Sequence, residues 1–83
     1  MELVEVQDRI DAFIREQFRV AEDDPRFDRS TDLYEGGYVD SVGVVELLAF
    51  IGEAFDVTVP EAELLSPDFS CVDGIGAVVH RLM

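Results

Sequence analysis

The stretch from residue 40 to residue 55, DSVGVVELLAFIGEAF, decides the fold, because two polar residues precede apolar residues that recur every three or four positions. That spacing predicts a helix with one buried face. Asp40 or Ser41 can begin the helix by capping its first backbone N–H groups, and Asp56 with the run up to Pro60 ends it. The positions expected to be buried are Val44, Leu47, Leu48, Ile51 and Phe55.

A second amphipathic pattern precedes this helix. Between Leu3 and Phe18 the apolar residues recur with the same spacing, which predicts a helix, and Asp11 lies one turn before Arg15, where the two side chains can pair. Its expected buried positions are Leu3, Val6, Ile10, Phe13, Ile14 and Phe18.

Two helices are expected in the last third of the chain. A short helical turn over 61–65 follows Pro60, and a final helix runs over about 71–82 with Val72, Ile75, Val78, Val79 and Leu82 buried. Ser70 and Asp73 have the spacing of a capping box at its start, and Cys71 is expected to be a small buried residue. Apart from a short V-T-V there is no strand signal, so the predicted fold class is all-α, a small four-helix bundle with three main helices and a short third one.

A long first loop, from Ala21 to Val39, contains Pro25 and a pair of glycines and has no helical pattern. Loops of this length are unusual in small chains unless they are functional or held by their own apolar residues. We therefore expect an ordered loop that is held against the core by Phe27, Leu33 and Tyr34.

Length and composition set limits on the class of protein. Eighty-three residues with 48% apolar content predict one folded, soluble domain over 1–83. No apolar run approaches the roughly 20 residues that cross a bilayer, and no signal peptide begins the chain, so a cytoplasmic location is expected. One cysteine, Cys71, and one histidine, His80, allow neither an intrachain disulfide nor a conventional zinc site, so no metal is predicted.

The net charge is strongly negative, with 19 acidic and 6 basic residues and a formal value of −13. Such a surface repels nucleic acid phosphates and anionic membranes, so neither is an expected partner. Basic protein surfaces are the natural complement.

The second helix is too apolar for a helix that buries only one face. Outside its core positions lie Val42, Val45 and Ala49 together with Glu46 and Glu53, and this set predicts a docking surface for partner proteins. The alternative is a central helix that is buried all round. Gly43 and Gly52 each disfavour a helix, which indicates either close approach by a partner or bound group, or tight packing against a neighbouring element.

Ser41 has three possible roles. A catalytic serine is disfavoured, because Val39 stands where the G-x-S-x-G motif needs its first glycine, no strand precedes Ser41, and His80 is the only possible imidazole base. Helix capping explains only one of the pair Asp40 and Ser41. Covalent attachment of a phosphate-linked group suits a serine in the first turn, where backbone N–H groups and the helix dipole favour an anion.

The segment Asp40-Ser41-Val42, followed by Gly43 to Leu47, resembles the Asp-Ser-Leu signature of acyl and peptidyl carrier proteins. Further segments fall in the register of that family: Asp32-Leu33-Tyr34, Phe55, Val59-Pro60-Glu61 and Phe69-Ser70. The resemblance implies a four-helix bundle of acyl-carrier type without catalytic activity of its own.

By the same resemblance, Ser41 receives 4'-phosphopantetheine from coenzyme A, and the thiol of that arm carries an acyl or aminoacyl thioester. Asp40 would assist the phosphopantetheinyl transferase and its magnesium, and Val42, Val45, Glu46, Ala49 and Glu53 would meet partner enzymes. Those partners would be a loading ligase or acyltransferase and downstream synthase or tailoring enzymes, acting on a monomeric carrier.

This sequence differs from the pattern of fatty acid carriers at several positions, and those differences indicate the subtype of carrier. Gly43, Gly52 and Ala54 stand where fatty acid carriers often have acids, and Gly37 with Gly43 is more similar to D-alanyl carriers and to stand-alone polyketide or nonribosomal peptide carriers. The sequence favours a discrete carrier, with its own Met1, of polyketide or nonribosomal peptide metabolism. D-alanyl and fatty acid carriers remain alternatives, as does an acidic helical interaction module that is never modified.

Overall fold

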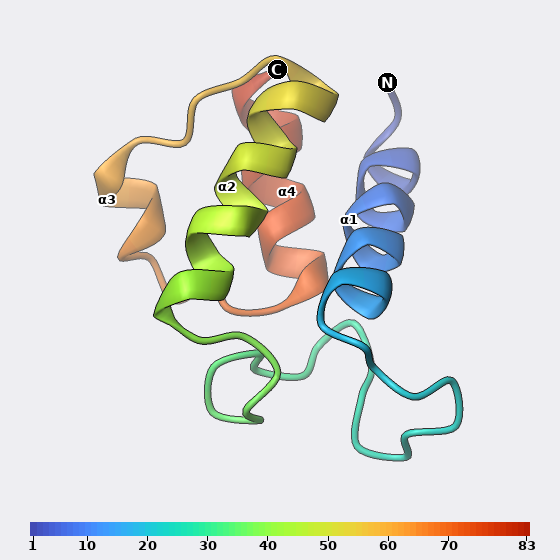
Figure 1. The fold of residues 1–83 in the computed structure, drawn as a ribbon. Coiled ribbons are helices and arrows are strands. Elements are labelled where there is room, and N and C mark those ends of the chain that lie inside the picture. The colour runs from blue at the N-terminus through green and yellow to red at the C-terminus, as the bar shows by residue number, and fades with distance from the viewer.

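A computed structural model describes residues 1–83, which form four helices and no strand. The helices are α1 (Leu3–Gln17), α2 (Ser41–Phe55), α3 (Glu61–Leu64) and α4 (Val72–Leu82). Figure 1 shows α1, α2 and α4 alongside one another, with the short α3 set to the side of α2. The prediction of an all-helical bundle with a short third helix is confirmed.

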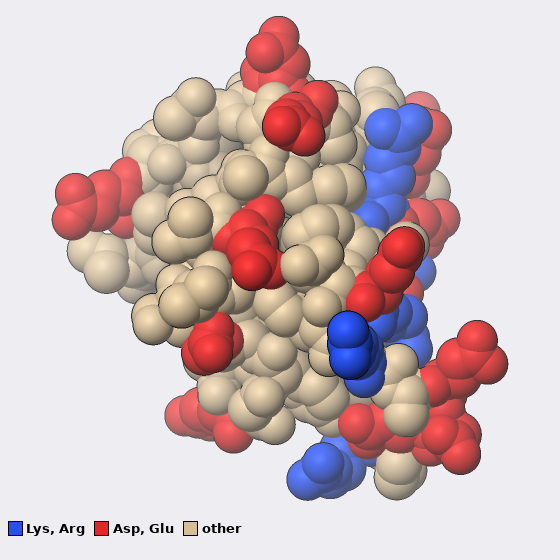
Figure 2. Space-filling model, in the orientation of Figure 1, with Lys and Arg blue, Asp and Glu red and all other residues tan.

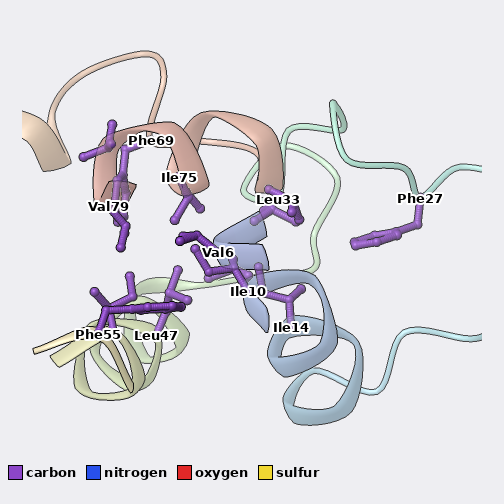
Figure 3. Close-up of a cluster of buried hydrophobic side chains, with 14 residues drawn as sticks. Val6, Ile10, Ile14, Phe27, Leu33, Leu47, Phe55, Phe69, Ile75 and Val79 are labelled. Atoms are coloured by element: carbon purple, nitrogen blue, oxygen red, sulfur yellow. The ribbon is translucent and has the colours of Figure 1, made fainter. Parts of the chain in front are cut away.

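One hydrophobic core joins the three long helices and the first loop (Figure 3). α1 packs chiefly against α4 and also contacts α2. A Cβ atom at Gly76 of α4 would overlap the Gln7 side chain of α1, so glycine permits the close approach of these two helices. The buried residues are Val6, Ile10, Ile14, Phe27, Leu33, Val39, Leu47, Ile51, Phe55, Phe69, Val72, Ile75, Val78 and Val79.

Some expected core positions lie at the edge of this core. Leu3, the first residue of α1, is exposed (39%). The side chains of Phe13, Phe18, Val44, Leu48 and Leu82 are only partly buried. The apolar spacing therefore identified the buried faces correctly and overestimated their width.

The start of α4 differs from its prediction. Cys71, not Ser70, is the N-cap residue, and its Sγ accepts a hydrogen bond from the Gly74 N–H at 3.3 Å. Ser70 instead donates its hydroxyl to the Pro67 carbonyl at 2.6 Å. The capping-box prediction is wrong, and Cys71, which was expected to be buried, is only half-buried.

The first loop is held against the helices as expected. Phe27 and Leu33 are buried, and the Leu33 N–H donates to the Ser70 carbonyl at 2.8 Å. Tyr34 is more exposed than predicted, but its hydroxyl donates to the Phe69 carbonyl at 3.1 Å. The loop thus connects α1 to the start of α2 along a fixed route past the start of α4.

No helix combines the length and the apolar character that a bilayer crossing requires. Nowhere do three or more His, Cys, Asp or Glu side chains gather in a way that could hold a metal ion.

Candidate functional site

Ser41 is the first residue of α2 and is exposed to solvent. Asp40 is the N-cap residue: its Oδ1 accepts the Gly43 N–H at 2.8 Å, and its carbonyl accepts the Val44 N–H at 3.0 Å. Asp40 therefore caps the helix, and the Ser41 side chain takes no part in capping. The N–H groups of Ser41 and Val42 have no partner within the helix, since the first-turn donors of a helix lack a preceding carbonyl.

The last residues of the first loop fix the direction in which the chain enters α2 at Asp40. Gly37 has a positive φ of 79°, a conformation that glycine adopts without strain. The N–H groups of Tyr38 and Val39 then both donate to the Leu33 carbonyl, at 2.9 and 3.0 Å. Val39 is buried, so the residue directly before Asp40 is fixed in the core.

A second contact fixes the same segment. The Tyr38 hydroxyl donates to Asp24 Oδ2 at 2.7 Å. This bond is the main reason why the pKa of the Asp24 carboxyl lies below its usual value and the pKa of the Tyr38 phenol lies above its usual value. The contact joins the two ends of the first loop.

Gly43 and Gly52 have different explanations. A Cβ atom at Gly43 would lie 2.7 Å from Phe18 Cε1, which is closer than real Cβ atoms approach, and 3.2 Å from Val39 Cγ1, which is tighter than most real contacts. Tight packing against a neighbouring element therefore explains Gly43, rather than close approach by a partner or a bound group. At Gly52 a Cβ atom would meet only the Val57 carbonyl oxygen at an ordinary 3.8 Å, and nothing in the structure explains the glycine there.

The outer face of α2 is open to solvent. Val42 and Val45 are 65% and 66% exposed, and Ala49, Glu46 and Glu53 are also exposed. The alternative of a helix buried all round is therefore wrong. Figure 2 shows this side of the molecule as mostly uncharged surface with separate acidic side chains, whereas the basic side chains in this view lie toward α1 and the loop after it.

An aromatic ridge between α1 and α2 was not predicted. The rings of Phe13 and Phe50 stack with centroids 4.2 Å apart, and a shallow hollow lies on each side of them. On one side, Gln17 Nε2 donates to Glu46 Oε2 at 2.6 Å. Phe50 lies between the core stripe and the outer face of α2, which is why the spacing assigned it to neither.

A serine hydrolase finds no support in this geometry. His80 is exposed in the last turn of α4, and no hydrogen bond joins it to Ser41. No strand leads into Ser41, so the strand-turn-helix elbow of such enzymes is absent.

Comparison with known proteins gives a family match and several relatives. A family model described as "Phosphopantetheine attachment site" matches residues 8–79. A D-alanyl carrier protein of Streptococcus suis (strain 05ZYH33) is 36% identical over 52 residues, covering 63% of this chain and 66% of the relative. A D-alanyl carrier protein of Lactobacillus delbrueckii subsp. bulgaricus is 35% identical over 51 residues, covering 61% of this chain and 64% of the relative. The matched region thus spans just under two thirds of the length of these relatives.

Proposed function

The chain belongs to the family of proteins with a phosphopantetheine attachment site, and we propose that Ser41 is the residue that carries the arm. The 4'-phosphopantetheine group is covalently attached in this family and supplies a terminal thiol that can hold an acyl or aminoacyl group as a thioester. The observation that carries the proposal is the exposed Ser41 hydroxyl at the first position of α2, which makes no hydrogen bond to the protein.

The residues around Ser41 fit a phosphodiester. A phosphate on its hydroxyl lies at the positive end of the α2 dipole, next to the unpartnered first-turn N–H groups, where an anion is favoured. The first turn of α2 contains no acidic residue that would repel it. The nearest carboxylate in sequence, Asp40, is held by the Gly43 N–H, and in our proposal it assists the transferase and its magnesium.

The cargo is an amino acid, and D-alanine is the first candidate. The relatives named as D-alanyl carrier proteins favour this alternative over the polyketide or nonribosomal peptide interpretation of the sequence. In this proposal an amino acid-activating ligase loads the thiol, and the carrier performs no catalysis itself.

The outer face of α2 is the proposed contact surface for the transferase and the loading enzyme. Val42, Val45 and Ala49 are exposed apolar residues of the helix that begins at Ser41, and Glu46 and Glu53 lie on the same face without an ion-pair partner. A partner surface that complements this face would have apolar residues at its centre and basic side chains at its edges.

A loading competition tests the cargo. The holo protein is incubated with ATP, D-alanine and a D-alanine-activating carrier ligase, and in parallel with an acyltransferase and malonyl-coenzyme A, and the intact mass is measured. We expect a D-alanyl thioester that hydroxylamine removes. Efficient malonylation with no D-alanyl product would contradict the cargo assignment and would favour the polyketide or fatty acid alternative.

A further inference from the structure

Asp11 is the only buried charged residue of the structure and is incompletely satisfied. It is 9% exposed, and its Oδ1 atom is buried and accepts no hydrogen bond from the protein. Its Oδ2 atom accepts from Arg15 Nε at 3.0 Å and lies 3.7 Å from Arg29 Nη2. Burying a carboxylate with one oxygen unsatisfied costs free energy, so packing alone does not explain why a charged residue occupies this position.

Arg29 is a residue of the first loop, and its guanidinium lies close to the Asp11 carboxylate. Its Nη2 donates to Asp8 Oδ1 at 2.8 Å, on the same face of α1 as Asp11. The backbone carbonyl of Arg29 accepts the Asp73 N–H at 3.0 Å, in the first turn of α4. The hydrogen bond with Asp8 also raises the pKa of the Arg29 guanidinium, against the effect of burial. A single loop residue therefore joins α1, the loop and α4.

Arg15 connects Asp11 to the part of the first loop that leads to Ser41. Its guanidinium carbon lies 4.5 Å from the centroid of the Phe27 ring, in a cation–π arrangement. Figure 3 shows Phe27 on the loop, apart from the other labelled side chains of the core. Phe27 packs edge-on against Tyr38, with centroids 5.2 Å apart. Tyr38 precedes Asp40 by two residues, so these contacts run from Asp11 to the residues that lead into α2.

We propose that Asp11 is a positioning residue, which acts through Arg15 and Arg29 to hold the first loop so that Ser41 is presented in one orientation. The part that concerns modification rests on the proposed role of Ser41. A buried ion pair adds little net stability, but it can select one arrangement of the groups around it. Arg15 and Arg29 are each 37% exposed at the side chain, so both can be solvated by water when the contact opens.

Native-state hydrogen exchange tests the structural part without any modification. Asp11→Asn keeps the shape of the side chain and removes its charge. We expect the Leu33 and Tyr38 amides to exchange at least tenfold faster, while the Ile75 amide of α4 stays within threefold of wild type. The matched control is Glu5→Gln, an exposed acid of α1 without an ion pair, which should change none of the three.

Two results would overturn the proposal at this stage. One is unchanged exchange of the loop amides in Asp11→Asn. The other is equal acceleration of Leu33, Tyr38 and Ile75, which would show that Asp11 contributes only to global stability. Arg15→Lys provides a second variant, because it keeps the charge and removes the planar group over Phe27, and it should accelerate the loop amides by a smaller factor in the same direction.

Kinetics of phosphopantetheinylation test the link to Ser41. If only a fraction of the carrier presents Ser41 correctly, its apparent affinity for the transferase falls by that fraction. We expect KM for Asp11→Asn to rise as the inverse of the fraction of molecules whose loop stays closed in the exchange experiment, with kcat within twofold of wild type. A KM that does not follow this fraction would overturn the positioning role. Failure of the proposed attachment would appear differently, as an unmodified wild type with the exchange result intact.

Discussion

Asp40 combines a structural and a chemical role that two substitutions can separate. Asp40→Ala removes the hydrogen bond from the Gly43 N–H to Oδ1, 2.8 Å long, at the start of α2. Loss of such a cap costs about 1 kcal/mol. With an unfolding entropy of about 2.1 cal/mol/K per residue, the 83 residues should lose about 6 °C in Tm. Asparagine caps as well as aspartate, so Asp40→Asn should stay within about 2 °C of wild type.

The assay combines thermal unfolding, followed by circular dichroism, with the rate of phosphopantetheinylation. If the Asp40 carboxylate assists the transferase, Asp40→Asn should be modified at least tenfold more slowly than wild type despite its normal Tm. Asp40→Ala should show both defects. A Tm for Asp40→Asn as low as that of Asp40→Ala would refute the capping argument. Modification of Asp40→Asn at the wild-type rate would show that the charge has no part in the reaction.

Three further predictions concern other parts of the molecule. Val45→Glu should slow loading by partner enzymes several-fold while the circular dichroism spectrum is unchanged; unaltered loading would contradict a contact role for Val45. Gly74→Ala should lower Tm despite the better helix propensity of alanine, because a Cβ atom there would overlap a backbone carbonyl oxygen of the preceding turn; a Tm at or above wild type would contradict this. Tyr38→Phe should raise the pKa of Asp24 toward 3.8 in an NMR titration, since the phenol hydroxyl favours the charged carboxylate. Because that pKa is lowered in the folded protein, the contact stabilises the fold above pH 3.8 and its contribution is lost as the pH falls below that value; an unchanged pKa of Asp24 in the variant would contradict the assignment.

The helices could be predicted because each has an apolar face of helical period. For α2, the polar pair before the run and Asp56 after it also indicated the ends, and Asp56 does adopt the left-handed conformation that ends the helix. The exposed face of α2 followed from the same reasoning, since too many apolar residues remained after the core was filled.

Other features depend on tertiary contacts that spacing does not encode. Ser70 has the residue type of a helix cap, but the chain enters α4 one residue later, so Cys71 occupies that position. Gly43 could be assigned to tight packing only once Phe18 and Val39 were placed against it. The contact of Arg29 with Asp8 spans 21 residues and has no local signal in the sequence.

Intact-mass measurement shows whether Ser41 carries the arm. The purified apo protein is incubated with coenzyme A, magnesium and a broad-specificity phosphopantetheinyl transferase, alongside Ser41→Ala and the exposed-serine control Ser30→Ala. We expect a mass gain of one 4'-phosphopantetheine group for wild type and Ser30→Ala, and none for Ser41→Ala. An unmodified wild type would favour the interaction module that is never modified, and a gain that persists in Ser41→Ala would place the arm on another residue.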